Sequence, residues 1–202
     1  LFIERAMIKA NERLSILSAE ASMNSPVLTD GTAFFQLQEE FRAAFENTVI
    51  DMPRSMLIAY PHLMNDVNIA VIATELTLAS ARDSIRVLAC LKQNAPQCKV
   101  LVVANNVQPA VVEISRKDFE STIERKIDLL LPADPKSVAQ AAKLGQPLVE
   151  AVRGSKLSAG IISLAEMVAG IFAEAAEAAP ADAKGKSKKT AFAGFKSMLK
   201  KK

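Results

Sequence analysis

The residues best placed for chemistry in this chain follow short apolar runs. Asp51 ends the run Thr48–Ile50, and Pro53 comes two residues later. A carboxylate at the end of a strand can hold Mg²⁺, usually through water, because Mg²⁺ requires oxygen ligands and keeps much of its hydration shell. The same carboxylate can equally end a strand in a turn with proline. Taken alone, the residue favours the turn.

A phosphate-binding loop of the GxxxxGK[ST] type would support the magnesium interpretation, and the chain has none. Gly185-Lys186-Ser187 looks like the end of such a loop. However, the residue five positions before Gly185 is Pro180, and no predicted strand precedes it. We therefore interpret these three residues as unrelated to phosphate binding.

Other polar groups also follow apolar runs. Asn105 and Asn106 come after such a run, and an amide there offers both a donor and an acceptor to an adenine edge. Two asparagines after a strand can equally make a turn. Pro132 and Asp134 end the last run, and Asp134 either belongs to a binding loop or caps the next helix. Glu75 follows an earlier run in the same way.

The elements that must position these groups alternate between amphipathic segments and short apolar runs. Helical spacing of apolar residues predicts helices, and short apolar runs predict strands. The alternation is typical of βαβ units around a mostly parallel sheet, where ligands bind beyond the carboxyl ends of the strands. The predicted helices are residues 1–9, 30–46, 55–64, 77–92, 115–125, 135–144 and 158–178, and the predicted strands are residues 14–18, 48–51, 67–73, 99–104 and 128–131. The runs 67–73 and 99–104 are typical of strands buried on both faces.

Length and composition fit one α/β domain of ordinary size. The 202 residues are 50% hydrophobic and 23% charged, which excludes disorder for most of the chain. His62, Cys90 and Cys98 lack ligand-spaced partners, and we interpret them as packing residues. The longest apolar stretch, Leu157–Ala165, is interrupted by Glu166 before it reaches the ~18 residues of a membrane span. We therefore expect a cytoplasmic protein.

Charge is concentrated at the C-terminus. Residues 184–202 hold eight lysines and no acid, which leaves 17 basic and 22 acidic residues in the rest of the chain. We divide the chain into a folded part, residues 1–179, and a basic, largely disordered tail, residues 180–202. The tail residues spaced as in a short amphipathic helix are Phe192, Phe195, Lys196, Met198 and Leu199.

Such a basic amphipathic segment suits an anionic membrane surface. Nucleic acid is a poorer partner for the tail, because base stacking uses several aromatic side chains and the tail has two. The remaining alternative is a flexible tail that binds nothing.

Five segments in order resemble the CpaE/TadZ proteins of Tad (Flp) pilus assembly, a branch of the ParA/MinD-like deviant Walker ATPases. Together they extend from Leu1 to Leu148, about three quarters of the chain. They are similar to the family's "lfleRa" helix, its Walker B strand, the helix after its "vtdlsla" segment, its "vvaNrv" strand and its closing "iP.D" stretch. The segments are LFIERAMIKANERLSILSAE, FENTVIDMPR, LTLASARDSIRVL, VLVVANNV and DFESTIERKIDLLLPADPKSVAQAAKLGQPL.

The resemblance implies a P-loop NTPase fold of the ParA/MinD type with ATP and Mg²⁺ as cofactors. Asp51 would be the Walker B carboxylate that holds Mg²⁺ through water. Asn105 would contact the adenine, and Pro132 and Asp134 would belong to the loop that passes over the base. Asn106 stands where relatives often carry arginine, so a charge contact from that position is absent here.

In that family the phosphate loop, its signature lysine and the first catalytic aspartate lie upstream of the segment that matches Leu1. The resemblance therefore implies a C-terminal part of the ATPase domain, incomplete at its N-terminus, that binds ATP weakly and does not hydrolyse it alone. The phosphate-loop strand lies mid-sheet in this fold. Without it, exposed strand edges and apolar helix faces predict poor solubility or partner-dependent folding.

The function implied by the resemblance is that of a nucleotide-responsive localisation factor that recruits pilus secretion machinery, including the Tad secretion ATPase. The complete protein would be a homodimer with ATP between the subunits, peripheral at the inner membrane and often at a cell pole. Two alternatives stay open. One is a degenerate, nucleotide-free adaptor, and the other is a ParA/MinD-like partition or division-positioning ATPase.

Overall fold

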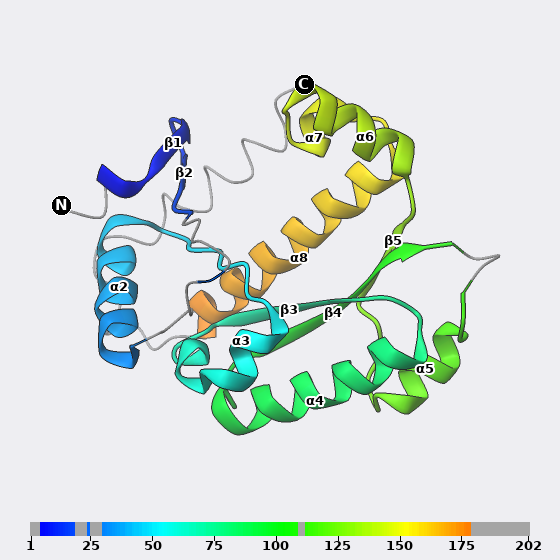
Figure 1. Ribbon diagram of the computed structural model, residues 1–202, viewed down its shortest axis with the longest axis horizontal. Helices are drawn as coiled ribbons and strands as arrows, with labels where there is room; N and C mark the ends of the chain where they lie inside the picture. Colours follow the sequence, from blue (N-terminus) through cyan, green and yellow to red (C-terminus); the bar gives the residue numbers. More distant parts are fainter. Residues whose placement is uncertain (1–4, 19–23, 25–29, 109–111, 179–202) are drawn as a thin grey trace.

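The computed structural model describes residues 5–18, 24, 30–108 and 112–178. Within these residues, β3 (Ile69–Thr74), β4 (Lys99–Val107) and β5 (Leu129–Pro132) form a parallel sheet in the order β3-β4-β5. Helices cover both of its faces (Figure 1). The predicted α/β fold with a mostly parallel sheet flanked by helices is therefore confirmed.

The core lies around β4, whose residues Leu101–Ala104 are at most 7% exposed. Val102 packs in one apolar cluster with Phe119, whereas Val103 packs in a second cluster with Leu131 and Leu157. Successive side chains of a strand point to opposite faces of the sheet. The two clusters therefore show that β4 is covered from both sides, as its apolar sequence predicted.

The longer helices around the sheet begin after short polar residues. On one face, α4 (Leu78–Asn94) follows Thr77 and α5 (Arg116–Thr122) follows Ser115; on the other face lies α8 (Lys156–Ala178). The short α6 (Pro135–Leu144), after Asp134, and α7 (Leu148–Ala151) join β5 to α8. Each of the three caps accepts a hydrogen bond from a backbone N–H three residues on, which satisfies a free donor of the helix end. The predicted bounds of α6 are those observed.

The N-terminal part differs from the prediction at three places, of which two concern helices. Of the helix predicted over residues 1–9, Arg5 and Ala6 are helical, but the prediction is wrong at its end, because Ile8 and Lys9 belong to β1 (Ile8–Asn11), which pairs antiparallel with β2 (Leu14–Ile16). Residues 1–4 lie outside the described residues. Next come α2 (Gly31–Ala44), α3 (Arg54–Ala59) and the 3-10 helix η1 (Pro61–Met64). The single helix predicted over residues 55–64 is therefore divided, because proline disfavours helical backbone in the residue before it.

The strand predicted over residues 48–51 is also wrong. These residues belong to no strand in the described part of the chain, and Val49 is 95% exposed. A strand requires a neighbour that accepts and donates its backbone hydrogen bonds. Among the residues that the structure describes, β3 likewise pairs only with β4, and Val71 is 43% exposed, although the sequence of β3 predicted burial on both faces.

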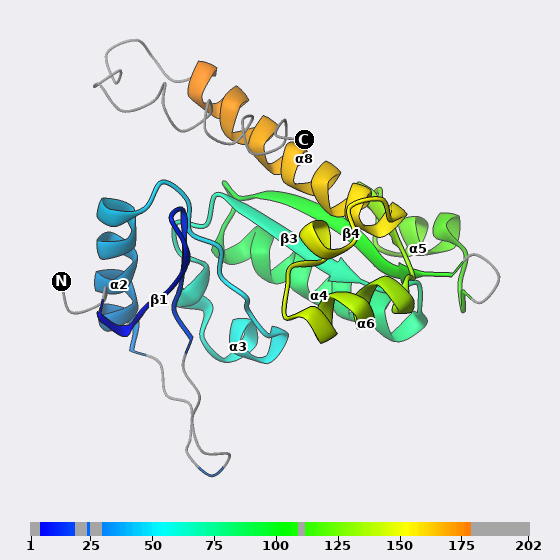
Figure 2. The ribbon, with the colours of Figure 1, turned by 90° about the horizontal axis from the view of Figure 1, so that it is seen from above.

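The first turns of α8 are packed against the sheet. Leu157 is buried there, Ile161 and Leu164 are partly buried beside it, and the last turns extend past the sheet (Figure 2). The stretch from Lys156 to Glu174 is long and apolar enough to cross a membrane, with a mean hydropathy of 1.5 and 11% of it buried. Core helices of soluble proteins can be equally long and apolar. The expectation that Glu166 rules out such a stretch is therefore corrected, because one carboxylate does not outweigh its neighbours.

Candidate functional site

The predicted site residues of the sheet lie along its carboxyl edge. Glu75 follows β3, Asn105 and Asn106 lie at the end of β4, and β5 ends at Pro132. Val107 and Pro132 are register partners, and the backbone N–H of Ala133 donates to the carbonyl of Val107 at 3.2 Å. The structure therefore places the end of β4 beside the turn that leads into α6, where open parallel sheets bind ligands.

Both asparagines are exposed, directly after four buried residues of the same strand. Asn106 has a φ of 54°, in the left-handed region that asparagine tolerates better than most residues. Its Nδ2 donates to Oε1 of Glu75 at 3.4 Å, which links the ends of β4 and β3. Asn105 is thus presented to solvent with its amide free to pair with a polar edge.

The N-terminus of α4 opens onto the same edge. The backbone N–H of Leu78 donates to Oε1 of Glu113 at 3.4 Å, so a carboxylate faces the positive end of the helix dipole. Sequence reasoning did not identify Glu113, because the short apolar run before it, residues 110–112, was not predicted to be a strand. Its position depends on a contact 35 residues away along the chain.

Asp134 caps α6. Its carboxylate accepts hydrogen bonds from the hydroxyl of Ser137 at 2.6 Å and from the backbone N–H of Ser137 at 3.0 Å. These two bonds, the hydroxyl first, lower the pKa of Asp134 below its ordinary value. Of the two roles considered from the sequence, the structure shows the cap. A role in a base-binding loop stays a prediction for Asp134, as for the half-buried Pro132.

Asp51 is exposed and outside any described strand. No described hydrogen bond or ion pair joins it to Asn105, Asp134 or Glu75, so the structure does not assemble it with the carboxyl edge. Nearby, Arg54 forms an ion pair with Asp83, which ties α3 to α4. Among the described residues, no three His, Cys, Asp or Glu side chains gather as a metal site. The magnesium role of Asp51 remains a prediction.

The predicted tail residues Phe192, Phe195, Lys196, Met198 and Leu199 lie outside the described residues. Two open cavities of about 400 Å³ occur in the described part of the chain. One lies at the amino-terminal edge of the sheet, next to Asp66 and Cys98, and the other lies on α6 beside Lys136 and Lys143. Neither adjoins the asparagines, which lie on an exposed part of the sheet's carboxyl edge.

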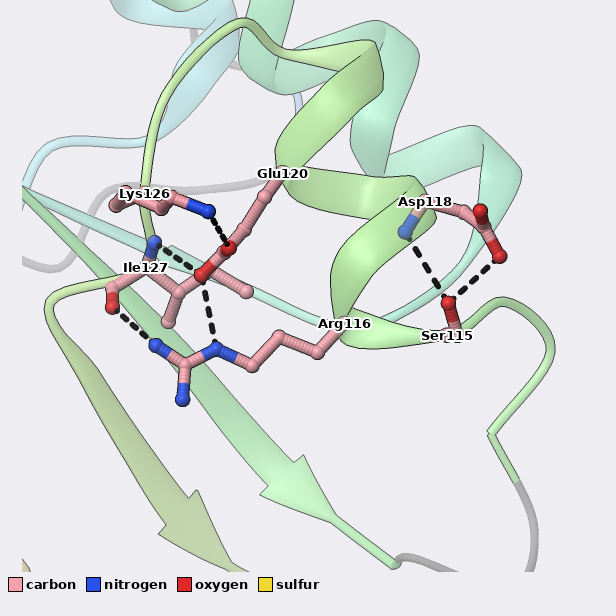
Figure 3. A network of polar contacts seen from close by, with 6 residues as sticks. All are labelled: Ser115, Arg116, Asp118, Glu120, Lys126 and Ile127. Carbon is pink, nitrogen blue, oxygen red and sulfur yellow. Dashed lines mark hydrogen bonds and ion pairs between the residues drawn. The ribbon is translucent and has the colours of Figure 1, made fainter.

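A network at the opposite edge of the sheet is structural (Figure 3). The carboxylate of Glu120, 8% exposed, accepts from Nζ of Lys126 at 2.8 Å, from the backbone N–H of Ile127 at 3.0 Å and from Nε of Arg116 at 2.8 Å. Lys126 contributes most, then Ile127 and Arg116, to lowering the pKa of Glu120 to about 2. Arg116 also donates to the carbonyl of Ile127 at 2.9 Å. The network therefore ties α5 to the segment that enters β5.

Comparison with known proteins gives structural relatives only. No protein-family model matches the chain, and no curated protein matches it by sequence. A ParA-family ATPase from Chlorobium tepidum superposes with a TM-score of 0.71 at 17% identity, over 80% of this chain and 66% of that one. The cell-division protein MinD of Aquifex aeolicus gives 0.66 at 22% identity, over 83% of this chain and 70% of that one.

A third similar structure, the septum-site-determining protein MinD of Pyrococcus horikoshii complexed with Mg-ADP, gives a TM-score of 0.67 at 19% identity, over 82% of this chain and 68% of that one. At these identities the likeness shows the fold: the chain has the α/β fold of ParA/MinD-type P-loop NTPases. The chain spans about two thirds of the length of each of these structures.

Proposed function

We propose that this chain supplies the base-binding edge of a ParA/MinD-like ATPase that acts as a positioning factor of the CpaE/TadZ kind and recruits pilus secretion machinery. One observation carries the nucleotide part of the proposal. The bulged end of β4 presents Asn105 beside the turn from Pro132 to Asp134, at the edge where parallel sheets bind ligands. The CpaE/TadZ assignment rests on the five sequence segments described above.

Three unfilled surfaces support the proposal that further strands complete the sheet. The open edge of β3 has an apolar sequence without the charges or proline that normally protect an edge. Val49 is exposed in a segment that reads as a strand, and α2 has no buried residue despite the apolar stripe from Phe34 to Phe45. An upstream strand between β3 and residues 48–51, followed by the phosphate loop, would cover these surfaces.

In the complete site, Mg²⁺ would neutralise charge on the phosphates of ATP. The exposed carboxylate of Asp51 fits one water-mediated contact to that ion and no more, since no cluster of ligands surrounds it among the described residues. Asn105 would pair with the adenine edge. Pro132 and Asp134 would shape the loop beside the base, with Asp134 also holding the start of α6.

The proposed partners follow from the same assignment. The complete protein would form a homodimer with ATP between subunits and would bind the Tad secretion ATPase, at the inner membrane and often at a pole. The basic residues 184–202 and the apolar α8 both suit a membrane surface. A second candidate function, a positioning or partition ATPase, is equally compatible with the ParA and MinD names of the structural relatives. A nucleotide-free adaptor is the third candidate.

Binding of fluorescent ATP to the full-length gene product tests the nucleotide role. Replacing Asn105 with alanine should weaken ATP binding about tenfold, because the polar edge of the adenine loses its hydrogen bonds to the side-chain amide. Asn68→Ala, which changes an exposed asparagine at the amino-terminal edge, should leave binding unchanged and serves as the control. Equal affinities for the two variants would exclude Asn105 as a base contact.

Co-purification with the pilus secretion ATPase from source cells separates the pilus role from the alternatives. A complex that forms with ATP and disappears with the Asn105→Ala variant supports the recruiting function. A protein that binds ATP but associates with chromosomal DNA or division proteins instead would support the second candidate. A protein that binds the secretion ATPase without binding ATP would be the adaptor.

A further inference from the structure

The end of β4 carries one residue more than the strand beside it. Between Ala104, the partner of Leu130, and Val107, the partner of Pro132, β4 has two intervening residues where β5 has one. An extra residue of this kind is a β-bulge, which bends the strand and redirects its side chains. The bulge therefore decides which way Asn105 faces at the carboxyl edge.

The backbone of this bulge has an uncommon conformation. Asn106, with its φ of 54°, is the residue that adopts it. Left-handed backbone carries a cost for residues other than glycine, although asparagine bears it better than most. A conformation of this kind persists where surrounding contacts fix it. A contact from a neighbouring element must therefore hold Asn106.

Glu75 makes that contact through the hydrogen bond between its Oε1 and Nδ2 of Asn106. Glu75 is itself well anchored, because its carbonyl accepts from the backbone N–H of Thr77 at 2.9 Å and from the hydroxyl of Thr74 at 3.4 Å. Thr74 in turn shares a buried hydrogen bond of 3.2 Å with Ser84 of α4. Glu75, whose backbone is fixed by these contacts with β3 and α4, thus holds the side chain of Asn106 in the bulge.

We propose that Glu75 is a positioning residue that holds Asn106 and thereby fixes the β4 bulge with Asn105 presented at the carboxyl edge. The identity of the ligand that Asn105 meets rests on the proposed function. The shape of the bulge does not, because the register and the hydrogen bond that define it here lie within the described residues.

Amide hydrogen exchange in the full-length gene product without nucleotide tests the positioning role. Glu75→Ala removes the acceptor and should make the amides of residues 105–107 exchange about fivefold faster, the effect of losing one ordinary hydrogen bond. Glu75→Gln keeps a side-chain oxygen and should remain within twofold of wild type. Glu113→Ala is the matched control, since it removes a carboxylate at the same edge that contacts Leu78 instead.

Fluorescent ATP binding by the same variants links the bulge to the base. Glu75→Ala should weaken ATP binding about fivefold, and Glu75→Gln should restore it. Unchanged exchange in Glu75→Ala overturns the positioning role whether or not the protein binds ATP. Faster exchange in a protein whose wild type binds no ATP supports the positioning role and refutes the proposed function. Faster exchange with unchanged ATP affinity overturns the link from the bulge to the base.

Discussion

Replacing Gly160 with alanine tests how α8 is seated on the sheet. A Cβ at this position would lie 2.6 Å from Cδ2 of Leu131, closer than such atoms approach. Leu131 is 8% exposed and packs with Val103 and Leu157, so its side chain has little room to move away. Overpacking of this kind costs about 1–3 kcal/mol.

A gain in helix propensity opposes this cost. Alanine is favoured over glycine inside a helix by about 1 kcal/mol. The net expectation for Gly160→Ala is therefore a loss of about 1 kcal/mol in the free energy of unfolding. Gly170 lies in the same helix with no atom within 4 Å of an added Cβ, so Gly170→Ala should gain up to ~1 kcal/mol.

The measurement is urea denaturation of both variants and the wild type, followed by circular dichroism, with equal slopes required for comparison. We expect the two variants to differ by about 2 kcal/mol, with Gly160→Ala the less stable. A Gly160→Ala protein as stable as Gly170→Ala would refute the contact between α8 and β5. In that case α8 would leave the sheet, and its apolar surface would be available to another partner.

Three further predictions concern the core, a helix cap and acid stability. Phe119→Ala should lower the free energy of unfolding by about 3–5 kcal/mol, because Phe119 is fully buried against α4 and β4; urea denaturation checks this. Thr77→Ala should cost about 1 kcal/mol by the same assay, since Thr77 caps α4 at the N–H of Ser80. The stability that ionised Glu120 contributes is present above its ordinary pKa of 4.5 and is lost as pH falls toward about 2. Glu120→Gln should therefore show a flatter fall of melting temperature across that range, and parallel curves would refute the network's role.

The sequence predicts well those features that depend on neighbouring residues. Asp134 was recognisable as a candidate helix cap because a short polar side chain can reach the N–H groups that follow it. The apolar runs of β3 and β4 predicted strands of a parallel sheet, and the register confirms that the two pair in parallel. The predicted burial on both faces is confirmed for β4 and is wrong for β3, where Val71 is exposed. Features of this kind need only the chain's own local chemistry.

Features that depend on tertiary contacts were missed. The network around Glu120 joins α5 to the segment that enters β5 through charged side chains, and no pattern of apolar residues in the sequence predicts it. The bulge at Asn106 also escaped prediction, because two asparagines after a strand are equally compatible with a simple turn. Only the register between β4 and β5 distinguishes the two.

The contrast between Asn105 and Asp51 follows from the same physics. Asn105 is placed by β4, a strand buried on both faces and paired on both edges, so its surroundings are fixed within the described chain. Asp51 ends a segment that has strand-like residues but no paired neighbour, and no described hydrogen bond or ion pair joins its carboxylate to the edge. A backbone that lacks a hydrogen-bonding partner gains nothing from an extended conformation. A nucleotide role for this chain therefore requires a neighbour for residues 48–51, and solving the structure of the full-length gene product should show those residues paired as a strand.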